Sequence, residues 1–215
     1  MRADLHTHTI FSDGELIPAE LVRRAMFLGH DLIAITDHVD MTNVEFVVTN
    51  VVKATELCDD YIRVIPGVEI THVPPRLIGE VAKRARKFGA KWIVVHGETV
   101  TEPVMPGTNK ASVENPDIDI LAHPGFITLD EAQTAKDNGV ILEITGRMGH
   151  NITNGHVYNM AHEVGAKMVI DSDTHAPENL MDEKAALTVA LGAGLTEKEA
   201  DVAMHVTPYE ATKNL

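Results

Sequence analysis

Histidines and carboxylates able to bind metal ions are unusually frequent in this sequence. The chain has 12 histidines but only three tyrosines and one tryptophan, and its single cysteine, Cys58, excludes a disulfide framework or a thiolate-rich zinc site. His6 and His8 are two residues apart, so on a strand both rings face one side and can bind one ion. Imidazole and carboxylate ligands without thiolates are typical of hydrolytic Zn, Mn or Fe sites, so these residue types predict metal-assisted hydrolysis.

Short apolar runs predict the strands that must position these residues. They lie near residues 3–5, 32–35, 62–70, 92–95, 118–121, 140–144 and 168–170. Segments with helical periodicity separate them, and four of these segments end at a glycine, namely Gly29, Gly89, Gly139 and Gly165. Continuous apolar runs suit parallel strands buried on both faces. Seven strands alternating with helices predict an α/β fold, a closed or nearly closed β/α barrel.

The remaining segments complete this prediction. Helices are expected at 51–61, which includes Cys58 as a packing residue, and after the last strand at 179–191 and 197–204. The segment 97–114 is the longest irregular stretch, and no linker divides the chain. We therefore expect one domain spanning residues 1–215.

Nine candidate ligands stand at or just after the predicted strands. They are His6, His8, Asp13, His38, Glu69, His96, His123, Asp173 and His175. In a β/α barrel the carboxyl ends of the strands converge on one face, so these side chains should share one pocket. A single histidine at a strand end is more often a hydrogen-bonded polar residue than a ligand. Burying this many polar groups without a cation would cost several kcal/mol each, which favours a metal centre.

Other polar residues have weaker interpretations. Arg147 follows the sixth strand and is either a phosphate clamp or a solvated loop charge. His72 and His150 are candidates for substrate contact at the rim, as is His156, whereas His30, His162 and His205 are expected in packing or surface positions. Glu143, Asp37 and Asp171 are either hydrogen-bond partners of the histidine ligands or polar residues that meet water.

Charge and hydropathy argue against nucleic acid and membrane as partners of this protein. The net charge is −14, from 18 Lys and Arg against 32 Asp and Glu, and such a surface repels nucleic acid at long range. No apolar run approaches the length of a membrane span, and the first residues do not resemble a signal peptide. We expect a soluble, cytoplasmic protein without a membrane partner; the oligomeric state has no signature in the sequence.

In order along the chain, these residues resemble the PHP (polymerase and histidinol phosphatase) family. The matching set is His6-x-His8, Ser12-Asp13-Gly14, Thr36-Asp37-His38, Gly67-Val68-Glu69, His96, His123-Pro124 and Asp173-x-His175, within residues 4–175. The resemblance implies a distorted seven-stranded, TIM-like barrel with two or three divalent ions, Zn, Mn or Fe, at its C-terminal face. By position, His6, His8, Glu69 and Asp173 would hold one ion; Glu69, His96 and His123 a second; Asp13, His38 and His175 a third.

The resemblance also implies an activity. A metal-bound hydroxide would attack the phosphorus of a small phosphomonoester, and the leaving group would take a proton from His175, from Asp173 or from water on a metal. Histidinol phosphate, an intermediate of histidine biosynthesis, is the first candidate substrate. Nucleotides and cyclic phosphates are alternatives, and an exonuclease is less favoured because an acidic chain with 4% aromatic residues offers little for binding a strand.

Two non-catalytic alternatives remain. One is an RNA-binding subunit of the ribonuclease P type, which would predict degraded metal positions and a basic surface. The other is a regulatory or storage metal protein, whose ion would lack an open coordination position for water. The filled ligand positions and the acidic charge disfavour the first.

Overall fold

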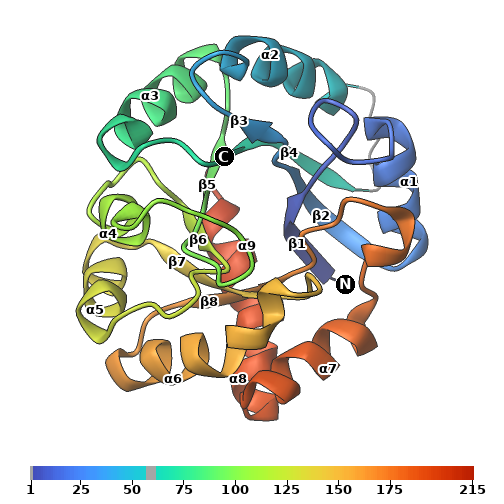
Figure 1. The fold of residues 1–215 in the computed structure, drawn as a ribbon. Coiled ribbons are helices and arrows are strands. Elements are labelled where there is room, and N and C mark those ends of the chain that lie inside the picture. The colour runs from blue at the N-terminus through green and yellow to red at the C-terminus, as the bar shows by residue number, and fades with distance from the viewer. Residues whose placement is uncertain (1, 57–61) are drawn as a thin grey trace.

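The computed structural model describes residues 2–56 and 62–215, and its strands form a nearly closed parallel barrel surrounded by helices (Figure 1). The barrel strands are β1 (Arg2–Thr7), β2 (His30–Ile35), β4 (Arg63–Ile70), β5 (Trp92–His96), β6 (Ile120–Ala122), β7 (Ile141–Thr145) and β8 (Met168–Asp171). They pair in that order, and a two-residue strand, β3 (His38–Val39), adds to β4. The predicted barrel is confirmed, and β3 is the one strand among the described residues that was not expected.

Most helices surround the barrel, whereas the last one, α9, appears inside the ring of strands in Figure 1. The helices are α1 (Pro18–Phe27), α2 (Val44–Thr55), α3 (Ile78–Phe88), α4 (Thr108–Val113), α5 (Leu129–Asn138), α6 (Asn154–Val164), α7 (Glu183–Ala193), α8 (Glu197–Asp201) and α9 (Thr207–Thr212). All four predicted helix-ending glycines have positive φ, between 72° and 116°. Among the described helices, none has the length and apolar character that crossing a bilayer requires.

Four predictions about helices and loops need correction. The expected helix 51–61 coincides only with the end of α2, and residues 57–61, including Cys58, lie outside the described residues. The segment 97–114, expected to be irregular, contains α4. The helix expected from residue 179 begins at Glu183, because the Asp182 side chain accepts a hydrogen bond from the Ala185 N–H and so caps it there. The last predicted helix, 197–204, changes after Asp201 into a π-helical turn that extends to Val206.

Alternation along the strands divides the apolar residues between two cores. On β2, Leu32 and Ala34 belong to the cluster inside the barrel, whereas Ile33 and Ile35 pack against the helices. Tyr209 and Ala211, both on α9, pack against the inner cluster. The lower part of the barrel is thus filled with side chains, which leaves the C-terminal strand ends for polar residues.

The seam between β1 and β8 is closed largely by side chains. A single backbone bridge, Thr7 with Thr174, joins them. Below it, Asp171 Oδ1 accepts a hydrogen bond from Leu5 N at 2.8 Å, and Asp4 Oδ1 accepts one from Ser172 N at 3.1 Å. Burial and the neighbouring Asp4 raise the pKa of Asp171 well above its usual value. These carboxylates fix the strands from which His6, His8 and Asp173 project.

Candidate metal centre

Strand alternation directs the key side chains into the barrel mouth. On β5, Trp92 and Val94 face the inner cluster, so His96, two residues further, points the same way. Glu143 follows the inward Ile141 by the same rule. Both residues are buried; His96 is the last residue of β5, and Glu143 is the third of the five residues of β7. Both therefore lie above the apolar residues that fill the inside of the barrel.

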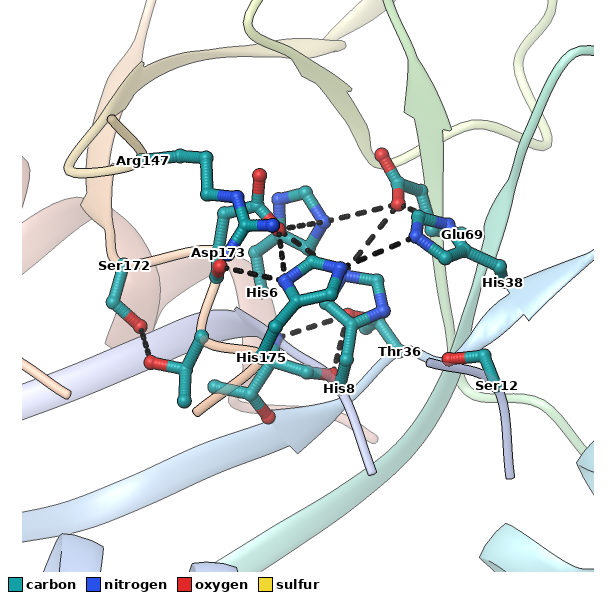
Figure 2. Close-up of polar contacts among 12 residues, drawn as sticks. His6, His8, Ser12, Thr36, His38, Glu69, Arg147, Ser172, Asp173 and His175 are labelled. Carbon is teal, nitrogen blue, oxygen red and sulfur yellow. Dashed lines mark hydrogen bonds and ion pairs between the residues drawn. The ribbon is translucent and has the colours of Figure 1, made fainter. Parts of the chain in front are cut away.

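The first expected ligand group converges as predicted (Figure 2). His6 Nε2 lies 3.3 Å from Glu69 Oε2 and 3.7 Å from Asp173 Oδ1; His8 Nε2 lies 3.5 Å and 3.2 Å from the same two oxygens. A tetrahedral ion with bonds of about 2.0–2.2 Å separates its ligand atoms by about 3.3–3.6 Å. His6 Nε2, His8 Nε2 and Asp173 Oδ1 are buried without a hydrogen-bond partner among the described residues. Orphaned donor atoms at these separations fit a divalent cation.

The group expected to hold a third ion also assembles. Asp13 Oδ1 lies 3.4 Å from His38 Nε2 and 3.2 Å from His175 Nε2, and the two nitrogens are 3.4 Å apart. The His175 Nδ1 lies 3.0 Å from the Asp173 carbonyl oxygen, so Nδ1 carries the proton and Nε2 has a lone pair to donate. These three atoms have the spacing of ligands around one ion.

The second group differs from the expected set. His123 Nε2 lies 3.6 Å from Glu69 Oε1, in agreement with the prediction. The ring of His96, however, meets two residues outside that set: its Nε2 lies 3.1 Å from Glu102 Oε2, and its donor atom groups with those of His123 and His150. Glu102 was missed because it lies in the irregular segment after β5, where no periodicity or strand end marks it.

Buried carboxylates behind the ligands orient them. Glu143 Oε1 lies 2.7 Å from His6 Nδ1, and its Oε2 accepts the backbone N–H of His123 at 2.9 Å. This contact leaves His6 Nε2 free to bind an ion. Asp37 does not contact a histidine ring; it accepts hydrogen bonds from the backbone and hydroxyl groups of Thr9 and Ser12 and so holds the loop that carries Asp13.

The electrostatics favour a cation at the first group. Burial lowers the pKa of His8 and of His123 well below the usual value, so both rings are neutral and have lone pairs to donate. Burial alone would raise the pKa of Glu69, but His6 and His38 lower it well below its usual value, so the carboxylate is ionised. Burial also opposes protonation of His6, yet Glu143, Glu69 and Asp173 together raise its pKa well above the usual value. His8 and His123 are therefore ready to donate lone pairs to a cation, whereas His6 has to release a proton when an ion binds at its Nε2.

Backbone strain marks the same region. The described residues other than glycine with positive φ are His72 (52°), His123 (28°) and Asp173 (50°). Each such conformation costs about 1–3 kcal/mol and persists only where the surrounding structure enforces it. Two of the three are expected ligands, and His72 lines the cavity. The chain therefore carries strain where it presents these polar groups.

A cavity of about 220 Å³ opens above the cluster. Its lining includes Arg147, His72 and His150, the three predicted substrate contacts, together with the unpredicted Glu102. Figure 2 shows the Arg147 side chain reaching toward Asp173.

The other histidines have structural partners. The His156 Nε2 lies 2.7 Å from the Ile127 carbonyl oxygen, and this residue does not line the cavity; His30, His162 and His205 contact Ala25, Glu199 and Asp201, respectively.

The chain is thus a β/α barrel whose C-terminal mouth carries clustered histidines and carboxylates that could hold metal ions. The family model of the PHP domain matches residues 4–180. The chain belongs to the PHP family.

Relatives and solved structures carry several functions. An uncharacterized protein of Methanocaldococcus jannaschii is 53% identical over the whole of both chains. Ribonuclease P protein component 3 of Methanosarcina mazei is 26% identical, covering 98% of this chain and 88% of its own. Histidinol phosphate phosphatase of Lactococcus lactis, solved with zinc, L-histidinol and phosphate, superposes with a TM-score of 0.65 at 17% identity, covering 91% and 94%. A chain of archaeal ribonuclease P solved with mature tRNA gives 0.70 at 17% identity, covering 98% and 90%. The structural matches establish a shared fold.

Proposed function

We propose that this protein is a metal-dependent phosphoesterase that hydrolyses a small phosphomonoester, with histidinol phosphate as the first candidate substrate. The observation that carries the proposal is the convergence of all nine expected ligands on one mouth of the barrel, beneath a cavity of about 220 Å³. That volume suits a small molecule and is below the usual range of about 300–1,000 Å³ for larger ligands. The phosphatase neighbour with bound L-histidinol and phosphate supports the choice of substrate.

The site residues would have two kinds of role, metal binding and phosphate binding. His6, His8, Glu69 and Asp173 would hold one divalent cation, Zn, Mn or Fe; Glu69, His96 and His123 would hold a second, and Asp13, His38 and His175 a third. Such ions supply Lewis-acid polarisation of phosphoryl oxygens and water of lowered pKa. Arg147 would bind phosphate through its planar guanidinium, whose fork of N–H donors matches phosphate oxygens. Asn179 Oδ1, 3.4 Å from Arg147 Nη1, holds the guanidinium at the cavity.

The proton for the leaving group is assigned to His175. Both residues line the cavity, but the His175 side chain is 11% exposed, against 4% for Asp173. Holding a proton at Nε2 and binding a cation there exclude each other. His175 therefore acts as donor only in molecules whose Asp13–His38–His175 group does not hold an ion.

Phosphate release from L-histidinol phosphate by Mn²⁺-loaded protein tests this function, with the chelated protein as control. We expect chelator-sensitive release that is faster than from an aryl phosphate. Equally slow release from L-histidinol phosphate and from the aryl phosphate would exclude histidinol phosphate as the substrate. Nucleotides and cyclic phosphates would then be the next candidates. No metal-dependent release from any phosphoester would overturn the phosphoesterase proposal.

A second candidate is a non-catalytic role in an RNA–protein complex, and the 26% identity with ribonuclease P protein component 3 supports it. The net charge of −14 opposes direct phosphate contacts, and every expected metal position carries a residue able to coordinate. Gel-shift titration with ribonuclease P RNA separates the two roles. We expect no complex at about 150 mM salt; a specific, saturable complex would favour the RNA role.

A further inference from the structure

One carboxylate at the cavity rim contacts three imidazoles, which come from the end of β5 and from the segments that follow β4 and β7. Glu102 Oε2 lies 3.1 Å from the Nε2 of His72 and 3.1 Å from that of His96, and its Oε1 lies 3.3 Å from His150 Nε2. None of Glu102, His72 and His150 belongs to the ligand set that the family resemblance implies.

The loop that carries Glu102 is fixed at its base. Glu98 Oε1 accepts the backbone N–H groups of Gly107 at 2.9 Å and Asn109 at 3.0 Å. Asn109 Nδ2 in turn donates to the Pro124 carbonyl oxygen at 2.8 Å, which ties the loop to the segment after β6. These hydrogen bonds hold the base of the loop from which Glu102 reaches the cavity, and they form without a bound ligand.

His150 is directed inward. Its side chain is 9% exposed, and its Nδ1 is buried without a hydrogen-bond partner among the described residues. Its ring centre lies 4.5 Å from that of His123, and the donor atoms of His96, His123 and His150 lie within 4.8 Å of one another. Three buried imidazoles at this distance would repel if protonated, whereas a shared cation makes the arrangement favourable.

The distances of 3.1 Å and 3.3 Å from the Glu102 carboxylate to His96 and His150 are those of ion pairs, and they also suit ligands of one ion. They lie at or just below the about 3.3–3.6 Å between ligands of a tetrahedral ion, and the smaller angles of a higher coordination number bring neighbouring ligands closer together. We propose that Glu102 and His150 are ligands of the cation held by His96 and His123. His72 is a positioning residue that holds the Glu102 carboxylate from the outer side.

The enlarged set changes which metal fits. With Glu69, His96 and His123, the two additional residues bring the protein donors beyond the four of a tetrahedral zinc site. Higher coordination with added carboxylate oxygen suits Mn²⁺ or Fe²⁺ better than Zn²⁺. This inference rests on the metal centre of the proposed function but not on its reaction or substrate.

Metal binding by Glu102→Gln and His150→Gln tests the assignment, with Glu114→Gln and His162→Gln as matched controls on exposed helical surface. Chelated proteins are reloaded with Mn²⁺, the bound ions per chain are counted by mass spectrometry, and affinity is measured by chelator competition. We expect each test variant to lose one ion per chain or to bind its weakest ion at least about tenfold more weakly. The controls should match the wild type.

A measurement on the wild-type protein covers the case in which His150→Gln fails to fold. Adding Zn²⁺ to ¹⁵N-labelled protein should shift the imidazole nitrogens of His150 together with those of His96 and His123, and leave His162 unchanged. Unaltered ion number and affinity in both variants, or an unshifted His150, would overturn the proposal. If the wild-type protein binds metal but hydrolyses no phosphoester, the proposed function is refuted and the ligand assignment is not. If it binds no metal, the proposed function and the ligand assignment are both refuted.

Discussion

Replacing Glu143 with glutamine should weaken the metal centre although the change is nearly isosteric. Glu143 is fully buried, and its two oxygens face two separate donors: the Nδ1–H of His6 at 2.7 Å and the backbone N–H of His123 at 2.9 Å. Glutamine has one carbonyl oxygen and one NH₂ group. In either amide orientation, an NH₂ group therefore faces one of these donors.

The magnitude follows from the two contacts. A buried donor left without an acceptor costs about 1–3 kcal/mol of stability. Groups that orient a metal-binding histidine typically contribute about 10–100-fold in metal affinity, equivalent to about 1.4–2.8 kcal/mol. For Glu143→Gln we expect metal affinity to fall within that range. The metal-free protein should lose about 1–3 kcal/mol in its free energy of unfolding.

Two assays separate these effects. Chelator competition measures metal affinity, and urea denaturation of the chelated protein measures the free energy of unfolding. Glu163→Gln, on the exposed face of α6, is the matched control and should change neither quantity. Wild-type metal affinity in Glu143→Gln would refute the claim that this carboxylate fixes the His6 ring for coordination.

Three further predictions concern a ligand, the barrel seam and a close backbone approach. Asp173→Ala should lower the number of bound ions measured by mass spectrometry and abolish turnover, while circular dichroism still reports a folded barrel. Asp4→Asn, which weakens a buried ion pair with Arg2 at 3.3 Å, should lower the free energy of unfolding in urea by about 3 kcal/mol. Gly125 and Gly139 both have positive φ, but only at Gly125 would an added Cβ meet a carbonyl oxygen, at 2.0 Å. Gly125→Ala should therefore be at least about 2 kcal/mol more destabilising than Gly139→Ala in the same assay.

The part of the site that follows strand geometry could be predicted from the sequence. His96 and Glu69 end buried strands, and the carboxyl ends of parallel barrel strands meet at one mouth, so their convergence required only the strand assignment. Asp13 lies in the loop after the first strand and was selected for that place alone, before the family resemblance implied its role. The structure places it 3.4 Å from His38, a distance that alternation along a strand could not have given.

Glu102 could not be predicted because its position depends on contacts between distant segments. It lies six residues beyond His96, in a loop held by Glu98 and by the Asn109 contact with Pro124. Such contacts leave no periodic pattern in the sequence. His150 was placed at the rim without a ligand role, because nothing in the order of residues shows that its ring lies 4.5 Å from that of His123.

The metal centre and the barrel closure share one seam, and this explains why buried acids accumulate there. Between β1 and β8 the backbone ladder is reduced to a single bridge, and the carboxylates of Asp4 and Asp171 accept the N–H groups that a regular ladder would satisfy. On the same two segments, His6 lies two residues after Asp4, and Asp173 lies two residues after Asp171. A seam closed by side chains can thus bring an imidazole and a carboxylate to 3.7 Å across strands that make few backbone contacts. The cost is a set of buried carboxyl groups near the site, and a divalent cation at His6, His8, Glu69 and Asp173 would favour their ionised forms. Metal binding and barrel stability are therefore expected to be coupled in this protein.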